Sequence, residues 1–215
     1  MFHIKNFIIL KKKIFNLNPD VNILVVSKNQ TMDKLKPLMN MKQIHFGENK
    51  VQEAKLKWSN IKADFIDLKL HFIGNLQSNK AKDAFEIFDY IHSLDNEKLA
   101  KIFNQLESNS NKKIKYFIQV NLGNEEQKGG VKIEHINEFI KFCLLDLKLN
   151  VIGLMCIPPA TANTEQFFKK LGEIAKKNNL TELSMGMSND YEDAIKHGST
   201  FVRIGSKIFS GEIIE

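Results

Sequence analysis

Lys28 is the residue whose chemistry is easiest to place. It follows the apolar run 23–26 and Ser27, at the carboxyl end of a predicted strand. An amine held in apolar surroundings loses its proton more readily, and a neutral amine condenses with an aldehyde or ketone to give an imine. A strand-end lysine that simply extends into water is the alternative, and the thirty lysines of this chain keep that alternative open.

Arg203 is the only arginine in the chain. A guanidinium presents a planar fork of donors that the ammonium of lysine cannot reproduce. Because lysine serves at every other cationic position, the retained arginine indicates a flat partner at residue 203. Compositional drift that happened to spare one arginine is the competing interpretation.

Two Gly/Ser turns follow the last two predicted strands. Ser188 ends the segment 183–188, and Gly205 and Ser206 come directly after 201–204. Backbone N–H groups and hydroxyls in such turns can hold a phosphate, and the last two loops of an α/β barrel are its usual phosphate site. Glycine permits close approach of the backbone, and serine adds a hydroxyl donor. Ordinary helix capping by the two serines is the alternative.

A reactive amine, a phosphate cradle and one planar cation together define a ligand. It carries a carbonyl at one end, a phosphate at the other and a flat, electron-rich ring between them. Pyridoxal 5′-phosphate (PLP) meets all three requirements, whereas a phosphorylated sugar on an aldolase lysine meets only the first two.

Short apolar runs alternate with helical stretches along the whole chain and must position these side chains. Such alternation predicts parallel strands joined by crossover helices. Eight strands predict an α/β fold, a single closed (β/α)8 TIM-like barrel, with an open doubly wound sheet as the competitor. The clearest helices are expected at 95–106, 133–145 and 164–177. The predicted strands are 23–26, 43–46, 70–73, 90–93, 114–120, 151–155, 182–185 and 201–204.

Composition narrows the class of protein. The 215 residues, with 43% hydrophobic and 26% charged side chains, are expected to form one globular domain over 1–215. The net charge of +6 is spread along the chain, which argues against a nucleic-acid binder. The N-terminal apolar run is too short for a signal peptide and no stretch is long enough to span a membrane, so a cytoplasmic protein is expected. Cys143 and Cys156 lie in apolar segments without metal-ligand spacing, which predicts reduced core thiols and no metal site.

An ordered set of motifs resembles the pyridoxal phosphate homeostasis protein family from about Asn22 to Phe209. The matching segments are 25–28, 46–49 with 51–53, 71–80, 128–131, 153–158, 184–188 and 198–205. The resemblance implies the PLP-binding barrel of fold type III, also found in the N-terminal domain of alanine racemase. It further implies that Lys28 forms the Schiff base with PLP.

The same resemblance implies roles for six other residues. The resemblance implies that Ser188, Gly205 and Ser206 hold the phosphate and that Arg203 faces the pyridine nitrogen. Asn49 and Met155 lie beside the ring.

Three features depart from the family pattern. The segment before the first strand is short and lysine-rich, so we expect a shortened leading helix. Pro37 is expected to shorten the helix after the first strand. Cys156 occupies a position that is often a small apolar residue.

Two classes of function are compatible with a PLP site. The resemblance implies a non-catalytic protein of intracellular PLP homeostasis that holds PLP and hands it to apo PLP enzymes. A monomer is expected. A PLP-dependent racemase-like or decarboxylase enzyme is the alternative, and a Schiff-base aldolase is a weaker one. Racemisation requires a base on each face of the substrate carbanion. Because the sequence ends ten residues after Gly205, no second domain is expected to supply the second of these bases. A cation at residue 203 would also disfavour protonation of the pyridine, which weakens its action as an electron sink.

Overall fold

Eight parallel strands close into a barrel in the computed structural model, which describes residues 1–62, 64–125, 127–159 and 163–214. The strands pair in the order β1-β2-β3-β4-β5-β7-β8-β9, and β9 returns to β1 with Leu24 opposite Arg203. This confirms the predicted (β/α)8 barrel. The barrel strands are β1 (Asn22–Val26), β2 (His45–Glu48), β3 (Lys69–Phe72), β4 (Tyr90–Leu94), β5 (Lys115–Asn121), β7 (Val151–Met155), β8 (Glu182–Met187) and β9 (Phe201–Ile204).

Each predicted run corresponds to one barrel strand, but the second is displaced. The strand β2 begins at His45 and continues through Glu48, two residues later than the apolar run indicated. The short strand β6 (Val131–Lys132) was not predicted, and its Val131 pairs with Val120 of β5. Two residues are too few to show a strand periodicity.

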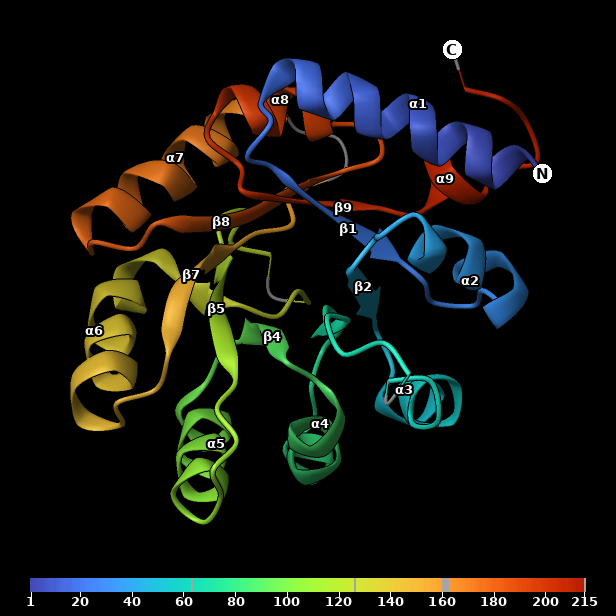
Figure 1. The fold of residues 1–215 in the computed structure, drawn as a ribbon. Coiled ribbons are helices and arrows are strands. Elements are labelled where there is room, and N and C mark those ends of the chain that lie inside the picture. Colours follow the sequence, from blue (N-terminus) through green and yellow to red (C-terminus); the bar gives the residue numbers. More distant parts are fainter. Residues whose placement is uncertain (63, 126, 160–162, 215) are drawn as a thin grey trace.

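Helices surround the ring of strands, as Figure 1 shows. The helix α1 contacts both α8 and α9 on one side of the barrel, where both ends of the chain also lie. The helices are α1 (Phe2–Leu17), α2 (Met32–Asn40), α3 (Val51–Trp58), α4 (Ala81–Ile87), α5 (Glu97–Ser108), α6 (Ile136–Lys141), α7 (Thr164–Lys177), α8 (Tyr191–Lys196) and α9 (Ser206–Phe209). Short 3-10 turns cover Ser78–Lys80 and Ile133–His135, and a π-helical turn covers Phe142–Asp146.

The expectation of a shortened leading helix is wrong, because α1 spans 16 residues. Its buried side chains recur at helical spacing through Phe7, Leu10 and Ile14, so packing stabilises the helix while its lysines face solvent. Buried Asn6 also bonds the end of the chain: its amide donates to the Glu212 carbonyl and its side-chain oxygen accepts from the Ile214 amide.

Pro37 lies inside α2 and does not end it, which corrects the second expectation. The helix continues to Asn40, and Leu35, Leu38 and Met39 are buried on its inner face. A proline inside a helix removes one backbone hydrogen bond and crowds the carbonyl four residues earlier, and here the packing of three large side chains outweighs that cost.

Packing between β7 and β8 leaves no room for a side chain at Gly153. A Cβ there would collide with the backbone carbonyl oxygen of Glu182. We expect Gly153→Ala to lower the free energy of unfolding by about 3 kcal/mol, the upper end of overpacking effects. Urea denaturation measures the change.

Gly172 in α7 is the matched control. Its added Cβ would meet the His197 carbonyl at 3.8 Å, an ordinary contact. Gly172→Ala should therefore raise the free energy of unfolding by roughly 0.5–1 kcal/mol, because alanine is the better helix residue. Equal stability of the two variants would contradict the close approach of β7 and β8.

The described part of the chain contains no helix whose length and apolar character would let it cross a bilayer.

Candidate functional site

Two adjoining cavities lie at the carboxyl end of the barrel strands. Their volumes are about 420 and 580 Å3, and both are lined by Val26, Lys28, Met187 and Arg203. The first extends over the ends of β3 to β5, and the second extends over the loops that follow β8 and β9. This is the end of an α/β barrel at which ligands bind.

The structure brings six of the seven predicted site residues to these cavities. Lys28 and Arg203 line both, Asn49 lines the first, and the second also includes the predicted phosphate residues Ser188, Gly205 and Ser206.

Met155 does not line either cavity. It is fully buried inside the barrel, in a small cluster with Tyr90, Phe117 and Phe201. Successive side chains of a strand face opposite ways. The last residue of a strand can therefore be next to the barrel mouth along the chain while its side chain points into the core.

The side chain of Lys28 is exposed. This corrects the expectation that it lies in apolar surroundings. The residue after it, Asn29, adopts a left-handed conformation with φ 58°, and its backbone N–H donates to Glu53 Oε1 at 2.7 Å. The turn that carries Lys28 is thus fixed on its far side by a carboxylate of α3.

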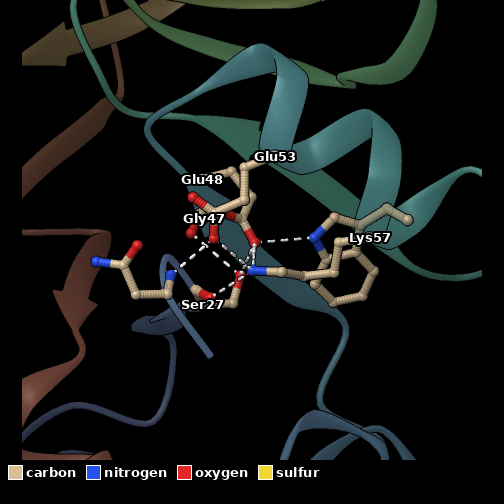
Figure 2. A network of polar contacts seen from close by, with 7 residues as sticks. Ser27, Gly47, Glu48, Glu53 and Lys57 are labelled. Atoms are coloured by element: carbon tan, nitrogen blue, oxygen red, sulfur yellow. Dashed lines mark hydrogen bonds and ion pairs between the residues drawn. The ribbon is translucent and has the colours of Figure 1, made fainter. Parts of the chain in front are cut away.

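A buried carboxylate fixes the near side of the same turn, as Figure 2 shows. Glu48 is fully buried, and its Oε1 accepts from Ser27 Oγ at 2.8 Å and from Trp58 Nε1 at 2.9 Å. Lys57 Nζ lies 2.8 Å from the same oxygen and also donates to the Ser27 carbonyl at 2.8 Å. Glu48 and Lys57 therefore hold Ser27, which precedes Lys28. Glu53 holds Asn29, which follows Lys28.

Arg203 is buried beneath the two cavities, with 4% of its surface exposed. One terminal nitrogen, Nη1, donates to the carbonyl oxygen of Ser184 at 2.7 Å and to Ser184 Oγ at 2.8 Å. The other, Nη2, donates to the Cys156 carbonyl at 2.8 Å. Burial lowers the pKa of Arg203, with the Cys156 thiol and Asp190 acting in the opposite direction, and a guanidinium in a protein stays charged.

The two Gly/Ser turns that were predicted to hold a phosphate differ from simple helix caps. Ser188 Oγ accepts from the Lys207 amide of α9 at 3.4 Å, so it joins the two loops rather than capping the helix of its own loop. Ser206 is the exposed first residue of α9, where backbone N–H groups have no partner within the helix. A Cβ at Gly205 would stand 3.1 Å from Val26 Cβ, which explains the small residue there.

Four functional candidates escaped the sequence analysis: His45, His71, His92 and Ser184. They form a line of hydrogen bonds inside the barrel that ends on Arg203. The available signal was a histidine in each of three consecutive strands, but which face each one occupies depends on the exact strand register.

Both cysteines are buried thiols. Burial raises the pKa of Cys143 and of Cys156 to about 12 in each case. Because the thiolate is the reactive form, we expect neither residue to react with a thiol reagent at pH 8 in the folded protein, and both to react in urea. Rapid labelling of Cys156 in the folded protein would show that the end of β7 opens.

The geometry defines a class of protein: a (β/α)8 barrel with an amine, a buried guanidinium and Gly/Ser turns at its mouth. The family of the alanine racemase N-terminal domain matches residues 6–212 of this chain. Within it, the chain belongs to the pyridoxal phosphate homeostasis protein family. It is 39% identical to such a protein of Aquifex aeolicus, over 87% of this chain and 85% of the relative, and 32% identical to that of Escherichia coli, over 88% and 85%.

Solved structures agree with this assignment. PipY of Synechococcus elongatus, determined without PLP, superposes with a TM-score of 0.89 at 32% identity, covering 98% of this chain and all of PipY. The PLP-bound form of PipY gives a TM-score of 0.81 at 31% identity, with the same coverage. Alanine racemase of Corynebacterium glutamicum, at 15% identity and a TM-score of 0.71, shares the fold over 60% of its own length.

Proposed function

We propose that this chain binds PLP at the mouth of the barrel and takes part in intracellular PLP homeostasis. The observation that carries the proposal is that Lys28, Arg203 and the Ser188 turn line the same cavity. The PLP-bound structure of PipY, which covers the whole fold, supports it.

The donor set fits the three parts of PLP. Lys28 is the amine for the aldehyde, and the Ser188 and Ser206 hydroxyls with the Ser206 amide are donors for the phosphate. Asn49 lines the part of the site on the other side of Lys28.

Arg203 is assigned to the pyridine nitrogen. Three of its five N–H groups are used within the protein, and among the described residues none accepts from the remaining two. When bound, PLP supplies an aldehyde conjugated to an electron-withdrawing pyridine. A fixed cation at that nitrogen disfavours its protonation, and the unprotonated ring withdraws electrons less strongly. This favours storage and delivery over catalysis.

The proposal includes five further points. The chain acts as one domain, as a monomer in the cytoplasm, and without a catalytic cycle of its own. It hands PLP to apo forms of PLP enzymes. The names of its relatives describe homeostasis, which supports a role without a catalytic cycle.

Borohydride reduction after incubation with PLP tests the binding. We expect one PLP mass per chain, located on Lys28 by peptide mass spectrometry. A protein that gains no mass at saturating PLP would refute the proposal.

A second assay separates the carrier from an enzyme. The PLP-loaded protein is incubated with D- and L-amino acids in heavy water, and exchange of the α-proton is followed by NMR. We expect exchange no faster than with free PLP. Sustained turnover would instead support the racemase-like alternative.

A further inference from the structure

A line of polar side chains crosses the inside of the barrel from one end to the other. His45 Nδ1 lies 2.9 Å from His71 Nε2, and His71 Nδ1 lies 2.8 Å from His92 Nε2. His92 Nδ1 then lies 2.8 Å from Ser184 Oγ, the atom to which Arg203 donates. The far end, His45, lines a separate cavity of about 450 Å3 at the amino ends of the strands.

The middle of this line is sealed from water. His71, His92 and Ser184 are fully buried. The ring of His71 stacks on Tyr90 with centroids 4.0 Å apart, and the ring of His92 stacks on Phe117 at 4.3 Å. The ring planes are therefore fixed by packing as well as by hydrogen bonds.

All three imidazoles are neutral at pH 7. Burial is the main cause that holds the pKa of His71 and of His92 well below the usual value. Burial, followed by the charges of Lys69 and Lys115, lowers the pKa of His45 to about 4. A neutral imidazole donates from one nitrogen and accepts at the other, so each ring must take one of two orientations of its proton.

Arg203 decides between the two orientations. A guanidinium can only donate, so Ser184 Oγ accepts from it and turns its own hydrogen to His92 Nδ1. His92 then carries its proton on Nε2 and donates it to His71 Nδ1. His71 in turn carries its proton on Nε2 and donates it to His45 Nδ1. In the reverse order the Ser184 hydroxyl hydrogen would have no acceptor among the described residues, and a buried unpaired donor is costly.

We propose that Ser184, His92, His71 and His45 are positioning residues that hold the guanidinium of Arg203 at the barrel mouth, and that Arg203 in return places the proton of every imidazole on Nε2. Each imidazole turns its accepting nitrogen toward Arg203, so the aligned dipoles stabilise a buried cation whose bonds go to carbonyl and hydroxyl oxygens. The hydrogen bonds from Arg203 to His45 lie within the protein and do not depend on a ligand. Only the effect of a fixed Arg203 on the pyridine nitrogen of bound PLP rests on the proposed function.

Nitrogen NMR of the ligand-free protein tests the proton order directly. Two-bond 1H–15N spectra distinguish the two neutral forms of an imidazole and the charged form. We expect His45, His71 and His92 all to be neutral with the proton on Nε2 at pH 7. A proton on Nδ1, or a mixture of forms, at His71 or His92 would overturn the proposal.

Ser184→Ala removes the hydroxyl and leaves the backbone carbonyl. We expect the fixed tautomers to become mixtures as far as His45, three side chains away. The single arginine Nε–H signal should also move, because Arg203 loses one acceptor. A purely structural role for Ser184 would leave the His45 spectrum unchanged, and that result would contradict the proposal.

Two variants of His92 supply a matched pair. His92→Asn places an amide oxygen where Nδ1 accepted from Ser184, whereas His92→Leu removes the acceptor. We expect the arginine signal to stay near its original position in the Asn variant and to shift in the Leu variant. Equal shifts in both would show that packing alone holds Arg203.

The loaded protein gives an independent readout. In His92→Leu and Ser184→Ala, the absorption band of bound PLP should shift and the Kd should rise roughly tenfold, the scale of one hydrogen bond to a charged group. Ordered tautomers in a protein that does not bind PLP would sustain the proton order and refute the proposed function. PLP binding by a protein whose imidazoles are mixtures of tautomers would sustain the proposed function and refute the proton order.

Discussion

Lys28→Ala should bind no PLP that borohydride can fix. The reason is chemical: the aldehyde carbon needs a primary amine, and Lys28 lines both cavities at the barrel mouth. The phosphate turns remain, so weak and reversible binding should persist in equilibrium dialysis. Peptide mass spectrometry after reduction measures the loss.

Misfolding cannot account for that loss, because Lys28 is exposed. Substitutions at such positions change the free energy of unfolding by less than about 0.5 kcal/mol. Lys28→Arg keeps the charge without an amine that can condense, and should behave like the alanine variant. Lys36→Ala, an exposed lysine of α2 outside both cavities, should load normally. An adduct that moved to Lys128, which lines the first cavity, would show that Lys28 is not required.

The fold was predictable because its signal is local. Each barrel strand is a short apolar run, and the order of runs and helices leaves few topologies. The mouth was predictable for the same reason, since the residue after a strand of a parallel barrel lies at the ligand-binding end. Lys28, Ser188 and Gly205 follow that rule.

Residues inside the strands were not predictable in this way. A strand reverses the direction of its side chains at each step, so an error of one residue exchanges the inside for the outside. Met155 points into the core rather than to the cavities, and Glu48 belongs to β2 rather than to the loop after it. The partners of His92 lie 21 and 92 residues away in sequence, a distance at which no local pattern indicates contact.

Glu48 illustrates what such a buried residue does for the site. Its carboxylate connects the turn before Lys28 to α3 through Ser27, Lys57 and Trp58. Its second oxygen, Oε2, is buried without a hydrogen-bond partner among the described residues, so the charge depends on contacts to Oε1. Stability and the position of Lys28 therefore depend on the same group.

Glu48→Ala should lower the free energy of unfolding by about 3–5 kcal/mol, the usual cost of breaking a buried ion pair. Lys57 Nζ would keep Glu53, at 2.9 Å, but lose its buried partner, while Ser27 and Trp58 would lose their acceptor. Glu48→Gln should cost less, because its amide oxygen can still accept from both. Urea denaturation at pH 7 measures these changes.

The exposed pair Glu97–Lys101 provides the control for Glu48. Both side chains are more than half exposed and lie 2.9 Å apart, so Glu97→Ala should cost under about 1 kcal/mol. Combining Glu48→Ala with Lys57→Met removes both charges and should recover part of the stability, since the second change no longer leaves a buried cation short of a partner. Strictly additive losses would mean that Glu48 and Lys57 are not coupled.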